Sequence, residues 1–242
     1  MSMAGDNSGR EIPTILYEDN HLLVAIKPAG WLSQADSSQS PDMLTELKAY
    51  LKQKYNKPGE VFLGLVHRLD QPVSGIMVFA RTSKAASRLS EQVREHRLER
   101  RYLAVIHSRP EAESGDIHVN LLKDKKTNIT RVDPAGLAST LHYRLLAFDA
   151  ASETSLVEIQ LGTGRSHQIR VSFAYAGWPL VFDQKYGLPR DRGRGDVALF
   201  AWKLAFEHPT KRERLEFAVP LSKQAPFDRF AGVDIALANV IS

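Results

Sequence analysis

A short polar segment between two apolar runs contains the side chains best suited to chemistry. Residues 62–66 and 76–79 are the apolar runs, and both have the composition of buried strands. A proline and a glycine between them predict a turn, which would fix Asp70 at a strand end on a rigid support, close to the cationic Arg68. This arrangement is typical of an active site. The alternative is an exposed turn in which Arg68 and Asp70 form an ordinary surface ion pair worth under about 1 kcal/mol.

A second polar segment, residues 162–170, reads GTGRSHQIR and follows an alternating apolar run. Its two glycines suggest a dinucleotide-binding fingerprint, but His167 stands where the third glycine is required, and this excludes that site. We expect the segment to begin a helix that ends near Gly177. The amides of such a helix N-terminus, with Arg165 nearby, suit an anion such as a phosphodiester. Without the motif, Arg170 would be interpreted as a surface arginine of this helix.

These segments resemble motifs of the RluA-type RNA pseudouridine synthases. The matching strings are Lys-Pro-x-Gly at 27–30, His-Arg-Leu-Asp at 67–70 followed by Ser-Gly at 74–75, a tyrosine after Arg-Arg at 102, and Gly-Arg-x-His-Gln-x-Arg at 164–170. The resemblance covers about residues 15–220, and four motifs in the right order are far more specific than any one of them. It implies that the protein isomerises uridine to pseudouridine in structured rRNA or tRNA, without a metal or another cofactor.

The resemblance also implies roles for three catalytic residues. The reaction breaks the bond between uracil N1 and the ribose, turns the base and rejoins it through C5. Asp70 would act at the ribose as a nucleophile or as a base, and Arg170 would pair with it and favour its charged form. Tyr102 would lie against the uracil face and help to remove the C5 proton.

The same resemblance indicates residues that bind the substrate. A uridine in folded RNA must be flipped out of its stack at a cost of a few kcal/mol, and Arg68 would occupy the space it leaves. The other predicted substrate-binding residues are His67, Arg165, His167 and Gln168. For His67, its place in the turn favours a bracing role over contact with the substrate. We expect no metal on His67, Asp70 and His167, because their spacing is not that of a metal site.

The family fold implied here is α+β, with a mixed, mostly antiparallel sheet, flanking helices and a central cleft. The chain itself predicts strands at 15–17, 22–26, 102–107, 117–122, 140–148, 156–161, 199–206 and 215–219. Helices are expected to start at Ser40–Pro41, to run from Thr82 or Ser83 to about Glu99, and to close the chain at 227–237. Residues 123–131 form a basic loop that either faces solvent or grips RNA, and 190–196 resembles a mobile surface loop.

Composition limits the remaining possibilities. The 242 residues, 43% of them apolar, suffice for one catalytic domain at 11–242 after a disordered tail at 1–10. The absence of cysteine excludes disulfides and thiolate chemistry, and the net charge of +4 is compatible with a polyanionic partner. We find no secretory signal and no run long enough for a membrane helix, so we expect a cytoplasmic monomer.

The early first strand leaves no room for the small RNA-binding domain that many relatives have in front, so the catalytic domain itself would recognise its target. Two alternatives to the synthase remain open. One is a catalytically silent RNA-binding module on the same fold. The other is a glycoside or nucleoside hydrolase, which needs a second carboxylate near Asp70; Glu60 and Asp183 are the candidates.

Overall fold

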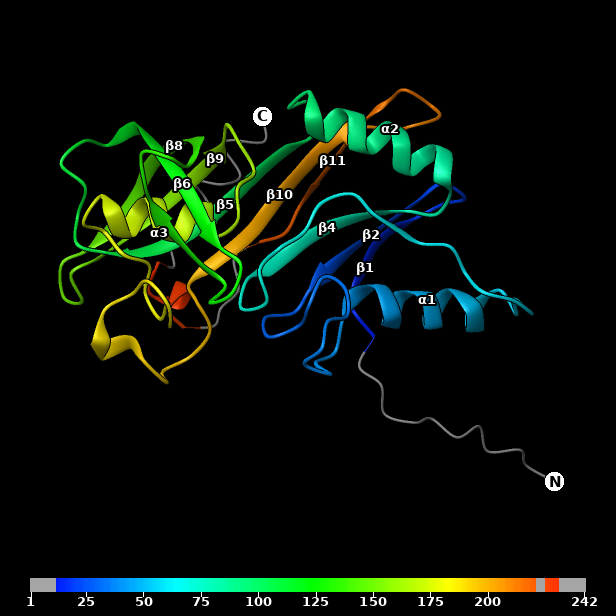
Figure 1. The fold of residues 1–242 in the computed structure, drawn as a ribbon, viewed down its shortest axis with the longest axis horizontal. Helices are drawn as coiled ribbons and strands as arrows, with labels where there is room; N and C mark the ends of the chain where they lie inside the picture. Colours follow the sequence, from blue (N-terminus) through cyan, green and yellow to red (C-terminus); the bar gives the residue numbers. More distant parts are fainter. Residues whose placement is uncertain (1–11, 221–224, 231–242) are drawn as a thin grey trace.

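The computed structural model describes residues 12–220 and 225–230. The predicted tail at 1–10 and most of the predicted closing helix at 227–237 lie outside these ranges. Within them, eleven strands form one sheet in the order β1-β2-β4-β10-β5-β9-β8-β6-β7, with β11 on β10 and β3 on β4 (Figure 1). The strands are β1 (Ile15–Glu18), β2 (Leu22–Lys27), β3 (Gly64–Leu65), β4 (Ser74–Ala80), β5 (Glu99–His107), β6 (Ser114–Asp124), β7 (Ile129–Val132), β8 (Leu137–Asp149), β9 (Thr154–Leu161), β10 (Leu199–Glu207) and β11 (Arg214–Ala218).

Three α-helices pack on this sheet: α1 (Met43–Lys54), α2 (Ser83–Arg94) and α3 (Gln168–Tyr175). Two short 3-10 helices, η1 (Pro189–Asp191) and η2 (Phe227–Arg229), complete the described part. Only β4 and β10 pair in parallel among the described strands. The expected mixed, mostly antiparallel α+β architecture is therefore confirmed.

Several element boundaries differ from the expected ones. The side chain of Asp42, not Ser40, caps α1 by accepting a hydrogen bond from the Thr45 amide. α2 ends at Arg94 rather than near residue 99, because the backbone at 99–101 pairs with β10. The basic loop is shorter than expected, since 129–132 pairs with β6 as β7.

The 190–196 segment is also more ordered than a mobile loop. It begins in η1, and the buried Asp191 carboxylate lies 2.7 Å from Nε2 of His107 at the end of β5. This contact fixes the loop that follows α3 to the central sheet. It was not predictable from local composition, because the two residues are 84 positions apart.

The two faces of the sheet bury different helices. One core contains Met43, Leu47 and Leu51 of α1 together with Ile169 and Phe173 of α3. A separate core on the opposite face holds α2 against the alternate side chains of β2 and β4. Because α1 and α3 share a face, the loops beside them border a common cleft.

The register of three strands sets the two halves of this cleft side by side. Ala201 of β10 pairs with Gly75 of β4 on one side and with Tyr102 of β5 on the other. Gly75 has a φ of 134°, and a Cβ there would collide with the backbone of Ala201. Only glycine permits this close approach. The turn before β4, with Asp70, is thereby held near Tyr102.

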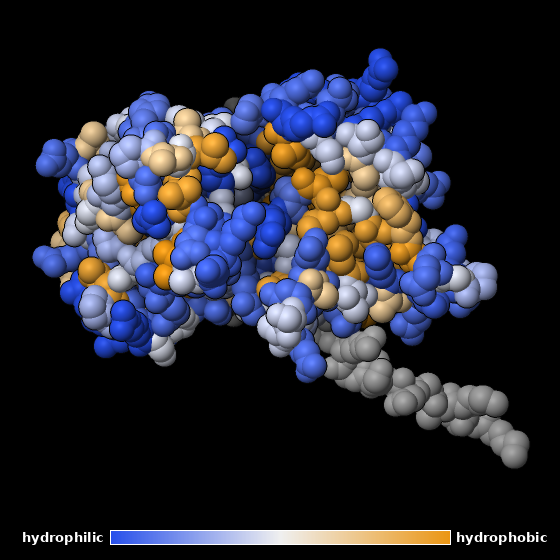
Figure 2. Space-filling view, in the orientation of Figure 1, coloured by the Kyte–Doolittle hydropathy of each residue, from blue (hydrophilic) through white to orange (hydrophobic). Residues whose placement is uncertain are grey.

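The space-filling view shows a hollow between the two halves of the molecule (Figure 2). Hydrophilic surface predominates on the α3 side, and an apolar area lies on the other half between α1 and α2. None of the helices in the described part is long and apolar enough to span a membrane.

Candidate active site

The peptide groups on either side of Asp70 are held by the turn that follows β2. The Ser33 hydroxyl accepts a hydrogen bond from the Leu69 amide at 3.1 Å and donates one to the Leu69 carbonyl at 2.9 Å. The buried Lys27 ammonium donates to the Gln71 carbonyl at 2.9 Å and also to two carbonyls of its own turn. Since both neighbours of Asp70 are anchored, its side chain projects from a fixed backbone. The lysine of the Lys-Pro-x-Gly motif thus helps to fix the backbone on which Asp70 stands.

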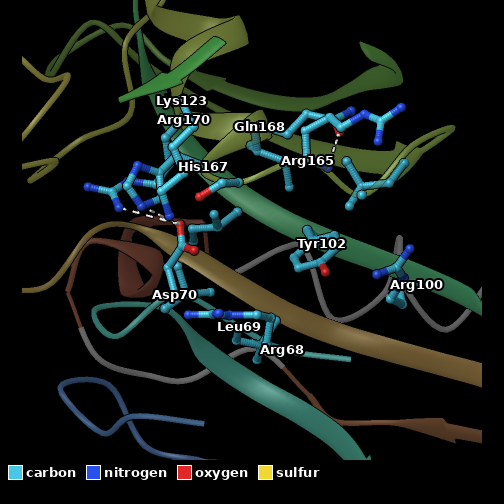
Figure 3. Close-up of a pocket in the computed structure, with 16 residues that line it drawn as sticks. Arg68, Leu69, Asp70, Arg100, Tyr102, Lys123, Arg165, His167, Gln168 and Arg170 are labelled. Atoms are coloured by element: carbon cyan, nitrogen blue, oxygen red, sulfur yellow. Dashed lines mark hydrogen bonds and ion pairs between the residues drawn. The ribbon is translucent and has the colours of Figure 1, made fainter. Parts of the chain in front are cut away.

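Asp70 faces the N-terminal part of α3 across the cleft (Figure 3). Its Oδ2 lies 3.5 Å from Nη1 of Arg170 and 4.0 Å from Nε2 of His167. Arg170 is 100 residues later in the sequence. The structure therefore brings together three of the residues that the motifs indicated.

Arg170 is bound more closely by Asp183 than by Asp70. Its Nε and Nη2 donate to the two carboxylate oxygens of Asp183 at 2.7 and 2.6 Å, and both side chains are buried. Burial raises the pKa of Asp183, but the hydrogen bonds and charge of Arg170 outweigh it and hold this pKa below its usual value. The expected ion pair between Arg170 and Asp70 is formed only by Nη1 of the guanidinium. The Arg170 guanidinium thus contacts both carboxylates, and its ion pair with Asp183 fixes its orientation.

Neither candidate for a second hydrolytic carboxylate is placed for that role. Both oxygens of Asp183 accept hydrogen bonds in the protein interior. The Glu60 side chain is 96% exposed and lies 3.9 Å from Lys52 on α1. The arrangement of two facing carboxylates that a glycosidase uses is therefore not formed by these residues.

A cavity of about 200 Å³ opens beside Asp70. Its lining comprises Arg68, Leu69, Asp70, Val73, Arg100, Tyr102, Lys123, Leu161, Gly164, Arg165, Ser166, His167, Gln168, Ile169, Arg170 and Leu199. Five of these residues are cationic, and only Asp70 is acidic. The cavity therefore combines apolar walls with a positive rim, which suits a flat base attached to a phosphate backbone.

Tyr102 forms part of the cavity wall on β5. It is 4% exposed, and burial raises the pKa of its hydroxyl above the ordinary value of 10.0. The side chain is a neutral phenol at neutral pH. Its ring can therefore contact a bound base, whereas a phenolate that would remove a proton is disfavoured.

His167 lies at the start of α3, with its ring against Tyr186. The ring centroids are 5.6 Å apart, and Nδ1 lies 2.6 Å from the Tyr186 hydroxyl. Burial, and the nearby Arg170 among other cations, lower the pKa of His167 to about 4, although Asp70 acts in the opposite direction. The imidazole is therefore neutral at physiological pH.

Two predicted substrate-binding residues are engaged inside the protein. His67 is buried, and its Nε2 accepts the Val78 amide at 3.1 Å, so it braces the turn and does not line the cavity. Gln168 borders the cavity, but its Oε1 accepts from the Thr163 hydroxyl and the Arg165 amide. Its Nε2 donates to the Thr140 carbonyl. The cavity lining thus does not include His67, and the side-chain amide of Gln168 is already bonded within the protein.

The Gln168 contacts also change the expected anion site at the start of α3. The Arg165 amide is occupied by Gln168, while the Arg165 side chain is exposed at the cavity rim and donates through Nε to the Ala138 carbonyl. Arg68 is likewise exposed at the rim. The exposed side chains of Arg165 and Arg68 are therefore candidate anion-binding groups at this end of the cavity.

Arg100 and Lys123 are cavity residues that the motifs did not indicate. Arg100 precedes the motif tyrosine by two positions, and Lys123 stands at the edge of the predicted basic loop. Their charges were visible in the sequence, but many basic residues are solvated and distinguishing them requires the fold.

The cleft geometry can be compared with known proteins. A family profile described as RNA pseudouridylate synthase matches residues 21–175. This chain belongs to the RNA pseudouridylate synthase family. The resemblance drawn from the motifs is confirmed, and the matched region contains Asp70, Tyr102 and Arg170.

Curated members of this family are similar over most of the chain. The ribosomal large subunit pseudouridine synthase C of Vibrio cholerae is 34% identical over 86% of this chain and 65% of its own length. An uncharacterised RNA pseudouridine synthase of Bacillus subtilis is 36% identical over 85% of this chain and 68% of its own length. The chain thus spans about two thirds of these pseudouridine synthases.

A solved structure shows the same fold. Human RNA pseudouridylate synthase domain containing 4 superimposes with a TM-score of 0.72 over 87% of this chain and 89% of that one, at 22% identity. The family fold expected from the motifs is therefore confirmed.

Proposed function

We propose that this protein is an RNA pseudouridine synthase that isomerises uridine in rRNA or tRNA. The observation that best supports it is the single ionisable carboxylate of Asp70 at a small cavity, opposite Tyr102 and 3.5 Å from Arg170. The reaction needs one group near the anomeric carbon, a surface for the detached base and no water as a reactant. The relatives named ribosomal large subunit pseudouridine synthases make large-subunit rRNA the first substrate to test.

Asp70 acts at the ribose in this proposal. The bond between N1 and C1′ breaks with its electron pair going to N1, C5 then bonds to C1′, and the C5 proton is lost while N1 gains one. Atoms and electrons balance without a co-reactant. Arg170 orients the carboxylate and offsets its charge, and the Tyr102 ring holds the base as it turns.

Binding requires the target uridine to leave its stack in the RNA. Arg68 is exposed at the cavity rim next to Asp70 and can fill the vacated space or contact a phosphate. Arg100, Lys123 and Arg165 surround the same opening. A positive rim around a pocket of this size favours a nucleotide that remains attached to its backbone.

The test compares wild type with Asp70→Asn on RNA extracted from a strain that lacks the protein, followed by site-resolved mapping of pseudouridine. We expect modification by wild type and a loss of roughly 10²- to 10⁴-fold in the variant. Asp116→Asn, which changes an exposed carboxylate on β6, is the matched control and should be fully active.

The outcomes separate the alternatives. Equal modification by wild type and Asp70→Asn would remove Asp70 from the mechanism. RNA binding without modification by either would indicate a silent binding module. Release of free uracil would indicate a hydrolase.

We also propose that residues 11–242 act as one catalytic domain and that the protein is a cytoplasmic monomer. The continuous sheet, in which β10 and β5 join the two halves of the described chain, supports the single unit. Light scattering after size exclusion tests the monomer: a mass twice that of the 242-residue chain would contradict it.

A further inference from the structure

The start of α3 has a backbone conformation that needs an explanation. His167 is the N-cap residue, but its φ is 53°, in the left-handed region, and its side chain makes no capping hydrogen bond. This conformation is uncommon for a residue other than glycine, and it persists only where the surroundings impose it. Here it turns the imidazole away from the helix amides and into the cleft (Figure 3).

A chain of hydrogen bonds reaches the His167 imidazole through Tyr186. The Thr130 amide donates to the Tyr186 hydroxyl oxygen at 2.9 Å. The hydroxyl then has its own proton available for Nδ1 of His167, 2.6 Å away. With the hydroxyl donating to Nδ1, that nitrogen bears no proton, and the single proton of the neutral imidazole is then on Nε2.

Nε2 is directed at the reacting part of the cleft. It lies 4.0 Å from Oδ2 of Asp70, which is too long for a hydrogen bond. The N–H is therefore available to a group bound between the two side chains. Because Asp70 acts at the anomeric carbon, the hydrogen-bonding atom of uracil nearest to that carbon is the carbonyl oxygen O2, whose carbon C2 is bonded to N1.

We propose that His167 donates a hydrogen bond from Nε2 to the uracil O2 oxygen as the glycosidic bond breaks, and that Tyr186 is the positioning residue that keeps the proton on Nε2. This inference rests on the proposed function. When the N1–C1′ bond breaks, the electron pair that goes to N1 is delocalised onto O2. A fixed donor at O2 then stabilises the detached base more than the bound uridine, which is the condition for a rate effect.

The surroundings suit a donor that stays neutral. Burial together with Arg170 and two lysines lowers the pKa of His167 to about 4. A charged imidazolium would instead attract Asp70 directly and compete with the substrate for its carboxylate. The neutral form avoids that contact and retains the N–H.

Tyr186→Phe keeps the contact of the ring with Arg170 and removes the two hydroxyl contacts, to His167 and to the Thr130 amide. The Tyr186 ring lies 5.2 Å from the Arg170 guanidinium, and Tyr186→Phe preserves this stacking while deleting the hydroxyl. We expect kcat to fall about ten-fold, with the RNA dissociation constant unchanged. Tyr143→Phe, which removes the hydroxyl of a buried ring packed in the core outside the cavity, is the matched control and should keep the wild-type kcat.

A second variant tests whether Tyr186 acts through His167. The amide nitrogen of glutamine can replace the imidazole Nε2 as a donor without a tautomer to control. His167→Gln should therefore retain more activity than His167→Leu. Adding Tyr186→Phe to His167→Gln should then cause no further loss.

The tautomer itself is measured by nitrogen-15 NMR of protein labelled at histidine, with the His167 signal assigned from its absence in His167→Gln. We expect Nε2 protonated and Nδ1 unprotonated at pH 7, and a mixture in Tyr186→Phe. A proton on Nδ1, or a Tyr186→Phe kcat within two-fold of wild type, overturns the proposal. Failure of the proposed function is a separate result: wild type would then form no pseudouridine, whereas the NMR spectrum would be unaffected.

Discussion

The Arg170 guanidinium forms a two-pronged ion pair with Asp183, at 2.7 and 2.6 Å, and reaches Asp70 only through Nη1 at 3.5 Å. A guanidinium oriented in this way cannot rotate to follow the Asp70 carboxylate. Asp183 neutralises much of the charge of Arg170. Arg170 therefore orients the Asp70 carboxylate as well as attracting it. The buried Asp183 therefore sets the position of Nη1, the guanidinium nitrogen that faces Asp70.

Arg170→Lys should therefore be poorly tolerated. A lysine ammonium can pair with Asp183 or with Asp70, but it does not reproduce the planar fork that serves both. We expect kcat to fall by roughly 10²-fold, since small misplacements of a catalytic group have effects of this size. Single-turnover kinetics on an unmodified RNA fragment that contains the target uridine measure it, and near-normal turnover would contradict the shared pairing.

The hydrogen bonds that Ser33 forms with the Asp70 turn give a second prediction. Ser33→Ala removes both hydrogen bonds to Leu69 but no group of the cavity. We expect the RNA dissociation constant to stay within about two-fold while kcat falls roughly 10-fold or more, because the backbone of Asp70 is less well fixed. Ser38→Ala, in the exposed part of the same loop, is the control. A raised dissociation constant with unchanged kcat would show that the turn serves binding instead.

Stability should fall in acid because of His67. Burial and then Arg100 lower the pKa of this buried imidazole from 6.5 to about 3. Between these two values the unfolded chain binds a proton that the folded protein does not, so the free energy of unfolding decreases as pH falls through this window. From pH 7.5 to pH 5 the decrease attributable to His67 is about 2 kcal/mol.

Urea unfolding at pH 7.5 and pH 5 tests this assignment. His67→Gln should be less stable than wild type at pH 7.5, where the imidazole accepts the Val78 amide, but should lose about 2 kcal/mol less on acidification. His118→Gln, which alters an exposed histidine of β6, should show the wild-type loss. An identical pH dependence in all three proteins would rule out His67 as the cause.

Salt dependence should identify which basic residues contact RNA. Lys123 lines the cavity, whereas Lys57 is exposed beyond the end of α1 and lies outside the cavity lining. If Lys123 neutralises one phosphate, Lys123→Ala should reduce the slope of log affinity against log salt by about 0.7. Lys57→Ala should leave the slope unchanged. Equal slopes for both variants would mean that Lys123 is only a solubility feature.

The sequence alone determined the motifs and most of the strands. The Asp70 turn was recognisable because two apolar runs enclosed a polar segment with a proline and a glycine, and these are local features. The family followed because four such segments occur in one order. Alternation of apolar residues likewise predicted β8 and β9 near their observed positions.

Tertiary structure decided how the indicated side chains are used. His67 and Gln168 lie within motifs, yet their polar atoms are bonded inside the protein, whereas Arg100 and Lys123 outside the motifs line the cavity. Asp183 lies 13 residues from Arg170 and Tyr186 lies 56 from Thr130, so neither contact follows from local spacing. Hydrogen bonds and ion pairs depend on distances of a few ångströms between distant segments, and only the packed sheet and helices set those distances.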